Sequence, residues 1–286
     1  MEPDRQLVVK SNHIIEASYR LSVAEQRVIL SAIAQVRRDQ PKITDEVLYS
    51  VTAAELAELC GTDPKTAYRD LQNAAERLQT RRVTLHLEPD GVTIRTKRRR
   101  VTCWVQTVDY IDQEGRIELR FGKDILPYLT GLQREFTRYA LSDVAKMTSA
   151  HGIRLYELLV QWPEGHRVVA LDDLRRWLQL EDRYPLMADL RRWVIEPAVQ
   201  QINEHSPLML TWSPRKAGRK VTHLVFDYAK KKPDKTASKA PGRPATKRKA
   251  DKYTDADIAR LGLARPGESW EAARTRLNQI PMELEP

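Results

Sequence analysis

Residues Leu171 to His205 read LDDLRRWLQLEDRYPLMADLRRWVIEPAVQQINEH, and this stretch decides the fold. Leu171, Leu174 and Leu178 recur at helical spacing, which predicts a short helix with one apolar side. After a polar turn, Pro185 suits the first turn of a second helix, because its missing N–H has no partner there. Two helices joined by a short turn predict a helix-turn-helix, a motif whose second helix enters the major groove of DNA.

The second helix has an apolar and a cationic side. At about 100° per residue, one side collects Leu186, Leu190, Trp193, Val194, Pro197 and Ala198. Arg192 lies nearly opposite, and Arg191 lies on the flank. An outward arginine near the start of such a helix suits DNA, because its fork can pair with O6 and N7 of guanine. An amphipathic surface helix with two solvated arginines gives the same pattern, so this stretch alone leaves both interpretations open.

A predicted hairpin follows the two helices. Leu208–Trp212 and Val221–Tyr228 are apolar and β-branched runs that predict strands, and Ser213–Lys220 between them predicts the tip. The tip holds Pro and Gly for the turn and four cations, Arg215, Lys216, Arg219 and Lys220. A helix-turn-helix followed by a basic hairpin is a winged helix, and basic wing tips suit phosphates or the minor groove. Arg183, in the turn between the helices, joins these candidate DNA contacts.

An earlier part of the chain repeats the helical pattern. Thr52 and Glu55 form a capping box, Gly61 ends the helix that follows, and Asp63-Pro64 begins the next. The exposed start of that next helix carries Lys65, Thr66, Tyr68 and Arg69, and of these Lys65, Thr66 and Arg69 are further candidate DNA contacts. Before this pair, Met1–Arg20 is expected to be an irregular arm, and a capped helix is expected to start at Ser22.

Strands are predicted after the first helix-turn-helix, at Val83–Leu87, Val92–Thr96, Val101–Val108 and Arg116–Phe121. Four consecutive cations interrupt this series: Lys97, Arg98, Arg99 and Arg100. They are either a wing that contacts DNA or a solvated sheet edge that charge protects against aggregation. Phe136–Leu141 then links to a second copy of the plan. The sequence therefore predicts an α+β fold of two tandem winged-helix domains with small antiparallel sheets, plus a disordered basic C-terminal tail.

The amino-acid composition indicates which class of partner the protein binds. The chain has 286 residues, a net charge of +9 and a pI of about 9.5, which suits a polyanion. Much of the excess lies in Lys230–Lys252, which is rich in Lys and Arg and too poor in apolar residues to order itself. The start is too polar for a signal peptide, and no apolar run approaches the ~20 residues needed to cross a bilayer. A cytoplasmic location is expected.

Several catalytic and cofactor signatures are missing from the sequence. Cys60 and Cys103 lack metal-ligand spacing and suggest no disulfide framework, and no P-loop motif occurs. The six histidines are scattered, without an H-x-H pair for metal-assisted nicking of DNA. Tyr139 and Tyr156 suit packing better than nucleophilic attack. We therefore expect no enzymatic activity, no cofactor and no metal site.

Over roughly Asn12 to Tyr228, these residues resemble the iteron-binding replication initiators of theta-replicating bacterial plasmids, the Rep family with paired winged helices. The similarity is carried by several short pieces in the same order along the chain: Leu21-Ser22, Glu25-Gln26, Arg154–Leu159, Leu171–Arg175, Asp189–Arg192, Glu196–Ala198, Ile202-Asn203, Gly218–Lys220 and Thr222–Phe226. Leu186 and Trp193 depart from the pattern, because some members carry arginine there. Base reading is then expected to use fewer residues or a different site sequence.

The resemblance implies a division of labour. Domain 134–228 reads one part of each directly repeated origin site, or iteron, with Arg191 and Arg192 as base readers and the wing on the backbone. Domain 1–133 contacts the adjoining part in monomers and supplies the self-association surface in dimers. Segment 229–253 is then a basic linker, and 254–286 a tail with short helices.

The resemblance also implies partners. Dimers of this family bind an inverted repeat at their own promoter and repress it. Monomers help to open A·T-rich DNA and recruit host proteins: the host replication initiator, the replicative helicase and chaperones. Two other functions stay open from the sequence alone, a winged-helix transcriptional repressor without an initiator role and, less in keeping with the motifs, a rolling-circle nickase.

Overall fold

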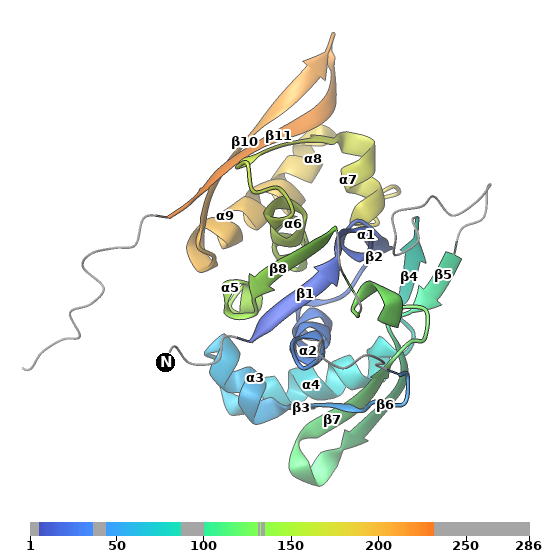
Figure 1. Ribbon diagram of the computed structural model, residues 1–286. Helices are drawn as coiled ribbons and strands as arrows, with labels where there is room; N and C mark the ends of the chain where they lie inside the picture. The colour runs from blue at the N-terminus through green and yellow to red at the C-terminus, as the bar shows by residue number, and fades with distance from the viewer. Residues whose placement is uncertain (1–5, 37–43, 87–99, 131, 133–134, 232–286) are drawn as a thin grey trace, which may run out of the picture. The chain divides into compact units, whose positions relative to one another are not determined.

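The computed structural model describes residues 6–36, 44–86, 100–130, 132 and 135–231, which belong to one compact unit (Figure 1). The predicted strand at Val92–Thr96, the cations Lys97, Arg98 and Arg99, and the tail beyond Lys231 lie outside the described residues. Helices and small antiparallel sheets make up the fold, as two tandem winged helices. No helix in the described ranges has the length and apolar character needed to cross a membrane.

Residues 7–19 form regular elements, so the expectation of an irregular arm was wrong for this part of the chain. It forms strand β1 (Leu7–Ser11), helix α1 (Asn12–Ile15) and strand β2 (Ser18–Tyr19). Strand β1 pairs antiparallel with β8 (Phe136–Ala140), which lies more than a hundred residues later in the chain. The sequence pattern hid the strand, because four consecutive residues of β1 are buried and apolar-polar alternation is therefore absent.

The first winged helix contains α2 (Val23–Ala34), α3 (Ala53–Cys60) and α4 (Pro64–Leu78). The predicted caps are confirmed: Thr52 and Glu55 form a capping box, Gly61 ends α3 with φ +65°, and Asp63 caps α4. The three-stranded sheets have the orders β3–β7–β6 and β2–β4–β5. The strands are β3 (Tyr49–Thr52), β4 (Arg82–Leu85), β5 (Arg100–Cys103), β6 (Val105–Ile111) and β7 (Arg116–Phe121).

One predicted strand is divided in two. The run Val101–Val108 belongs to β5 and β6, which lie in different sheets. Trp104 stands at the break between them and is fully buried. Its ring meets Tyr19 edge-on, with centroids 4.9 Å apart. The tryptophan therefore anchors the crossing from one sheet to the other, a tertiary effect that a periodic pattern does not reveal.

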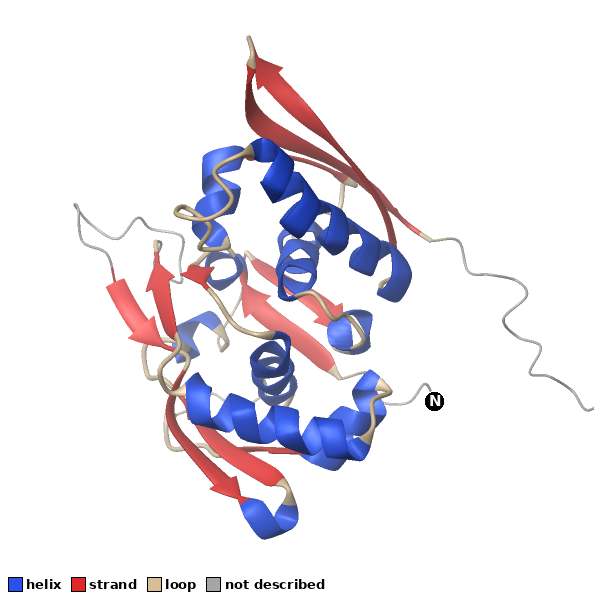
Figure 2. Cartoon of the chain, turned by 180° about the vertical axis from the view of Figure 1, so that it is seen from behind, coloured by secondary structure: helices blue, strands red, loops and turns tan. Residues whose placement is uncertain are grey.

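The second winged helix has the elements α5 (Ser142–Ala145), α6 (Ala150–Val160), β9 (His166–Ala170), α7 (Leu171–Trp177), α8 (Met187–Leu190), a π-helical turn (Arg191–Ile195), α9 (Glu196–His205), β10 (Leu208–Ala217) and β11 (Lys220–Lys230). Its sheet has the order β10–β11–β9. In Figure 2 the helix formed by α8 and α9 and the helix α4 both face the viewer.

The second helix of this helix-turn-helix differs from the prediction in its start and in its buried side. It begins at Met187 rather than at Pro185. Leu186 is 65% exposed and Trp193 is 56% exposed, although both were expected on the apolar side. The buried residues are instead Leu190, Val194, Ile195, Ala198 and Ile202.

The π-helical turn explains the change of face. In a regular α-helix, each step of four residues turns about 40° too far, so a row at this spacing drifts around the helix. A π turn contains more residues and cancels part of that drift. Pro197 supplies a cause, because it has no N–H for the carbonyl of Trp193 and its ring crowds that carbonyl. The row Leu190, Val194, Ala198 and Ile202 consequently stays on the core.

Candidate nucleic-acid interface

The turn before the second helix is held by one arginine. Nη1 of Arg175 donates to the carbonyl of Arg183 at 2.9 Å, and Nη2 donates to that of Tyr184 at 2.7 Å. Gln179 and Tyr184 have φ values of 51° and 53°, the left-handed conformation that lets the chain turn sharply. Arg175 therefore fixes the angle between α7 and the helix that begins at Met187.

The two predicted base-reading arginines have different surroundings. Nε of Arg191 lies 2.6 Å from Oε1 of Glu196 in an exposed ion pair, and its guanidinium lies 5.9 Å from the centre of the Trp212 ring. The guanidinium of Arg192 lies 4.9 Å from the centre of the Trp193 ring and makes no ion pair with any described residue. Arg192 is thus available to an anion or a base edge, whereas Arg191 must first leave Glu196.

The wing carries its cations into solvent. Arg215, Lys216, Arg219 and Lys220 are all exposed. The strands extend farther than predicted, so the tip is only Gly218-Arg219, and the expected tip at Ser213–Lys220 was too long. Gly218 has φ +61°, as a two-residue hairpin turn requires. Pro214 is tolerated within β10 because this is an edge strand, where its missing N–H interrupts no ladder.

The first helix-turn-helix presents a smaller cationic surface. Lys65 and Arg69 are exposed on the first two turns of α4, and Thr66 is half-buried. The backbone N–H of Thr66 donates to Oδ2 of Asp63 at 3.1 Å, so this N–H is already satisfied by the cap. These three residues share one end of α4, as the sequence predicted.

The remaining predicted contacts that the structure describes are less exposed. Arg183 is half-buried, and its guanidinium lies 5.3 Å from the centre of the Tyr184 ring. Arg100 is half-buried at the start of β5. Its neighbours in the basic run are outside the described residues, so the choice between wing and sheet edge stays open there.

Family comparisons agree with this arrangement. A family model described as "Initiator Replication protein, WH1" matches residues 7–160, and one described as "Initiator Rep protein, WH2" matches residues 170–228. The chain belongs to the initiator replication protein family. Both matched parts of this initiator contain a helix-turn-helix with an exposed cationic second helix.

Individual relatives of the initiator are distant. A "Replication initiation protein" from Escherichia coli is 26% identical over 227 residues, which cover 77% of this chain and 68% of the relative. The "PI protein" from Escherichia coli is 21% identical over 248 residues, covering 76% of this chain and 80% of the relative. The crystal structure of Pi initiator protein in complex with iteron DNA has a TM-score of 0.67 at 20% identity, covering 80% of this chain and 99% of that one. That likeness establishes the shared fold.

A buried charge cluster joins the two halves of the initiator, and sequence reasoning missed it. Lys10 on β1 pairs with Glu157 on α6, and both are about 1% exposed. Arg154 contacts the same carboxylate at 3.2 Å and donates to the carbonyl of Ile15 at 2.8 Å. The hydroxyl of Tyr139 donates to Glu157 at 2.5 Å. The available signal was a lysine in an apolar strand and an Arg-x-x-Glu pair on an apolar helix.

The electrostatics of this cluster favour a charged carboxylate. Burial acts to raise the pKa of Glu157, but the charges of Lys10 and Arg154 outweigh burial and hold that pKa below its usual value. Burial lowers the pKa of Lys10, and Glu157 opposes the shift. Tyr139 on β8 and Tyr156 on α6 are both buried, which confirms packing as their role.

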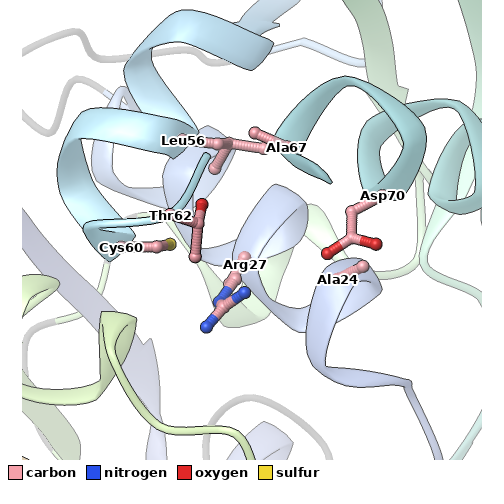
Figure 3. Close-up of a pocket in the computed structure, with 7 residues that line it drawn as sticks. All are labelled: Ala24, Arg27, Leu56, Cys60, Thr62, Ala67 and Asp70. Carbon is pink, nitrogen blue, oxygen red and sulfur yellow. The ribbon is translucent and has the colours of Figure 1, made fainter. Parts of the chain in front are cut away.

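A small hollow among α2, α3 and α4 is lined by residues that include Arg27, Cys60 and Asp70 (Figure 3). Burial raises the pKa of the Cys60 thiol, which makes it a poor nucleophile. Arg27 turns its guanidinium to the backbone of the second half, donating to the carbonyl of Ala145 at 3.0 Å. Among the described residues, no group of three His, Cys, Asp or Glu side chains is placed to hold a metal ion.

Proposed function

We propose that this protein starts DNA replication at a plasmid origin by binding directly repeated sites, or iterons, as a monomer. The observation that carries the proposal is the pair of exposed cationic helices, one in each winged helix of an initiator-family chain. The fold shared with the Pi initiator, whose structure holds iteron DNA, supports the same ligand here. In this proposal the protein acts by binding and has no catalytic activity.

The two winged helices divide the site between them. The helix from Met187 enters the major groove of one part, with Arg192 as the foremost base reader and Arg191 joining after it leaves Glu196. The wing cations contact the backbone beside it, and Lys65, Thr66 and Arg69 on α4 contact the adjoining part. Trp193 on this helix and Leu186 directly before it present apolar surface, which suits thymine methyl groups.

We further propose that a dimer binds an inverted repeat at the gene's own promoter and represses it. The support is the resemblance to initiators that control their copy number in this way. Recruitment of the host replication initiator, the replicative helicase and chaperones belongs to the same proposal. A cytoplasmic location follows from a DNA target in a bacterial cell.

A footprint on the DNA that flanks the gene tests the proposal. Protection of direct repeats of about two helical turns each, beside an A·T-rich segment, is expected. Protection of a single inverted repeat alone would favour a plain transcriptional repressor. Nicked supercoiled DNA with covalently attached protein, formed in the presence of Mg²⁺ or Mn²⁺, would favour a nickase and contradict the proposal.

The variant Arg192→Ala tests the reading helix on the protected site. It should lose about 1–3 kcal/mol of binding free energy and relax the preference at one base pair. Arg138→Ala, which removes an exposed arginine on β8, is the matched control and should leave the preference intact. A uniform loss on all DNA sequences would instead make Arg192 a phosphate contact.

A further inference from the structure

A cleft of about 450 Å³ separates the two winged helices, and neither of the predicted contact surfaces includes it. Its walls come from elements on both sides of β1 in Figure 1, with α6 and α7 on one side and α2 and α4 on the other. The side chains that line it include four arginines and a histidine: Arg20, Arg77, Arg81, Arg154 and His151. No aspartate or glutamate is among the described residues that line it.

The two carboxylates that pair with arginines of this cleft are buried and have other partners as well. Glu25 is fully buried, binds Arg81 at 2.7 Å and accepts the N–H of Ser22. Glu157 is buried in the cluster with Lys10 and Arg154. Arg20 and Arg77 are exposed and have no ion pair within the part of the chain that the structure describes. The cleft therefore has an excess of positive charge that the folded chain leaves uncompensated.

Arg154 adds an unsatisfied donor. Its side chain is 3% exposed, and its Nη1 and Nη2 atoms are bound by Tyr19, Glu157 and backbone carbonyls. Its Nε is buried without a hydrogen-bond partner. A buried donor without a partner is costly, so this arginine is held beside the cleft at a price in stability and keeps its positive charge there.

His151 lies among the same positive charges. It lies on the first turn of α6, and burial lowers its pKa to about 4, with further lowering by the charges of Arg20, Arg183 and Arg154. The imidazole is thus neutral at pH 7 and surrounded by cations. An anion in the cleft would offset these charges and raise the pKa of His151. Measuring that pKa therefore shows whether an anion is bound in the cleft.

We propose that this cleft binds a phosphate group and that the DNA backbone supplies it. The inference rests on the proposed DNA-binding function. DNA held by both helix-turn-helix units must cross the junction between them, and each strand presents one negative charge per about 3.4 Å of axis. Arginine forks match phosphate oxygens in geometry as well as charge. A phosphate bound here would contact both winged helices at once and link site recognition to their relative placement.

The double variant Arg20→Gln/Arg77→Gln of the full chain tests the cleft, because both side chains are exposed and their loss should leave the fold intact. Binding to the footprinted site is measured over a range of KCl concentrations. Loss of one phosphate contact should reduce the slope of log K against log[salt] by about 0.9. The matched control Lys123→Gln/Arg138→Gln removes two exposed charges outside the cleft and should keep the wild-type slope. A slope equal to that of the control would overturn the proposal.

Two further measurements identify the source of the phosphate. A neutral methylphosphonate, moved stepwise along the DNA, should weaken wild-type binding at a position where the double variant is insensitive. NMR titration of His151 with inorganic phosphate reports the alternative source. A raised pKa with inorganic phosphate, combined with no methylphosphonate position specific to the wild type, would overturn the assignment to DNA. Failure of the wild type to prefer any DNA site would instead contradict the proposed function itself.

Discussion

At the scale of the residue, Glu157 is the counter-charge of two buried cations. It is the only carboxylate in contact with both Lys10 and Arg154 within the described residues, and all three are buried. The substitution Glu157→Gln leaves two buried cations without a counter-charge. We expect a loss of about 3–5 kcal/mol in the free energy of unfolding, measured by urea denaturation. The exposed Glu164→Gln should change it by less than about 0.5 kcal/mol, and equal effects would contradict the assignment.

His151 predicts a dependence of stability on pH. Its pKa is about 4 in the folded chain, because of burial and neighbouring arginines, against 6.5 for an ordinary histidine. Between these values the unfolded chain binds a proton that the folded chain does not, so stability falls as pH falls from 6.5 to 4. The loss approaches about 3 kcal/mol at pH 4. Urea denaturation at pH 7 and pH 4.5 should show a smaller loss for His151→Gln, and identical losses would refute the role.

At the scale of the element, two neighbouring residues of the helix from Met187 have different roles, one in stability and the other in DNA recognition. Val194 is 2% exposed and Trp193 is 56% exposed. Val194→Ala should destabilise the protein by about 1–2 kcal/mol through lost packing, with little change in site preference. Trp193→Ala should do the reverse, lowering affinity for the preferred site while the urea midpoint stays near that of the wild type. A Trp193→Ala protein that unfolds as easily as Val194→Ala would place Trp193 in the core after all.

Local chemistry made several elements predictable from the sequence. The capping boxes, Gly61, the Asp63 cap and the first helix-turn-helix depend on residues within a few positions of each other, and all appear as expected. The second helix-turn-helix is also present, but its second helix starts at Met187 and buries a different side. Strand β1 was missed because its partner β8 is distant in sequence. The exposure of Trp193 was missed because a π turn shifts the buried side.

Part of the candidate site could likewise be predicted from the sequence, and part could not. The cations of α4, of the helix from Met187 and of the wing are visible in the sequence as local clusters, and most of them are exposed in the structure. The cleft arginines are not visible in this manner, because Arg20, Arg77 and Arg154 come from three distant segments. Only the packing of the segment after β2 against α4 and α6 brings them together.

At the scale of the whole molecule, contacts between the two winged helices predict that they unfold together. Strand β1 pairs with β8, Arg154 donates to the carbonyl of Ile15, and Nη2 of Arg167 lies 2.6 Å from Oε1 of Glu16. Arg154 and Arg167 are both buried, so the second winged helix has charged groups whose partners lie in the first twenty residues. Separating the halves would expose these groups and the apolar surface around them.

The fragment 142–231 therefore should not reproduce the stability of the whole. In the full chain, far-UV circular dichroism and tryptophan fluorescence should report one coincident urea transition, because Trp104 and Trp177 lie in different winged helices of one cooperative unit. The fragment 6–231 ends where the compact unit ends and should keep the same midpoint. The fragment 142–231 loses β1, β8, Glu16 and the carbonyl of Ile15, so its midpoint should fall sharply or its transition should lose cooperativity. A midpoint for 142–231 equal to that of 6–231 would mean that the two winged helices are energetically independent, and Lys10 and Glu157 would then serve only local packing.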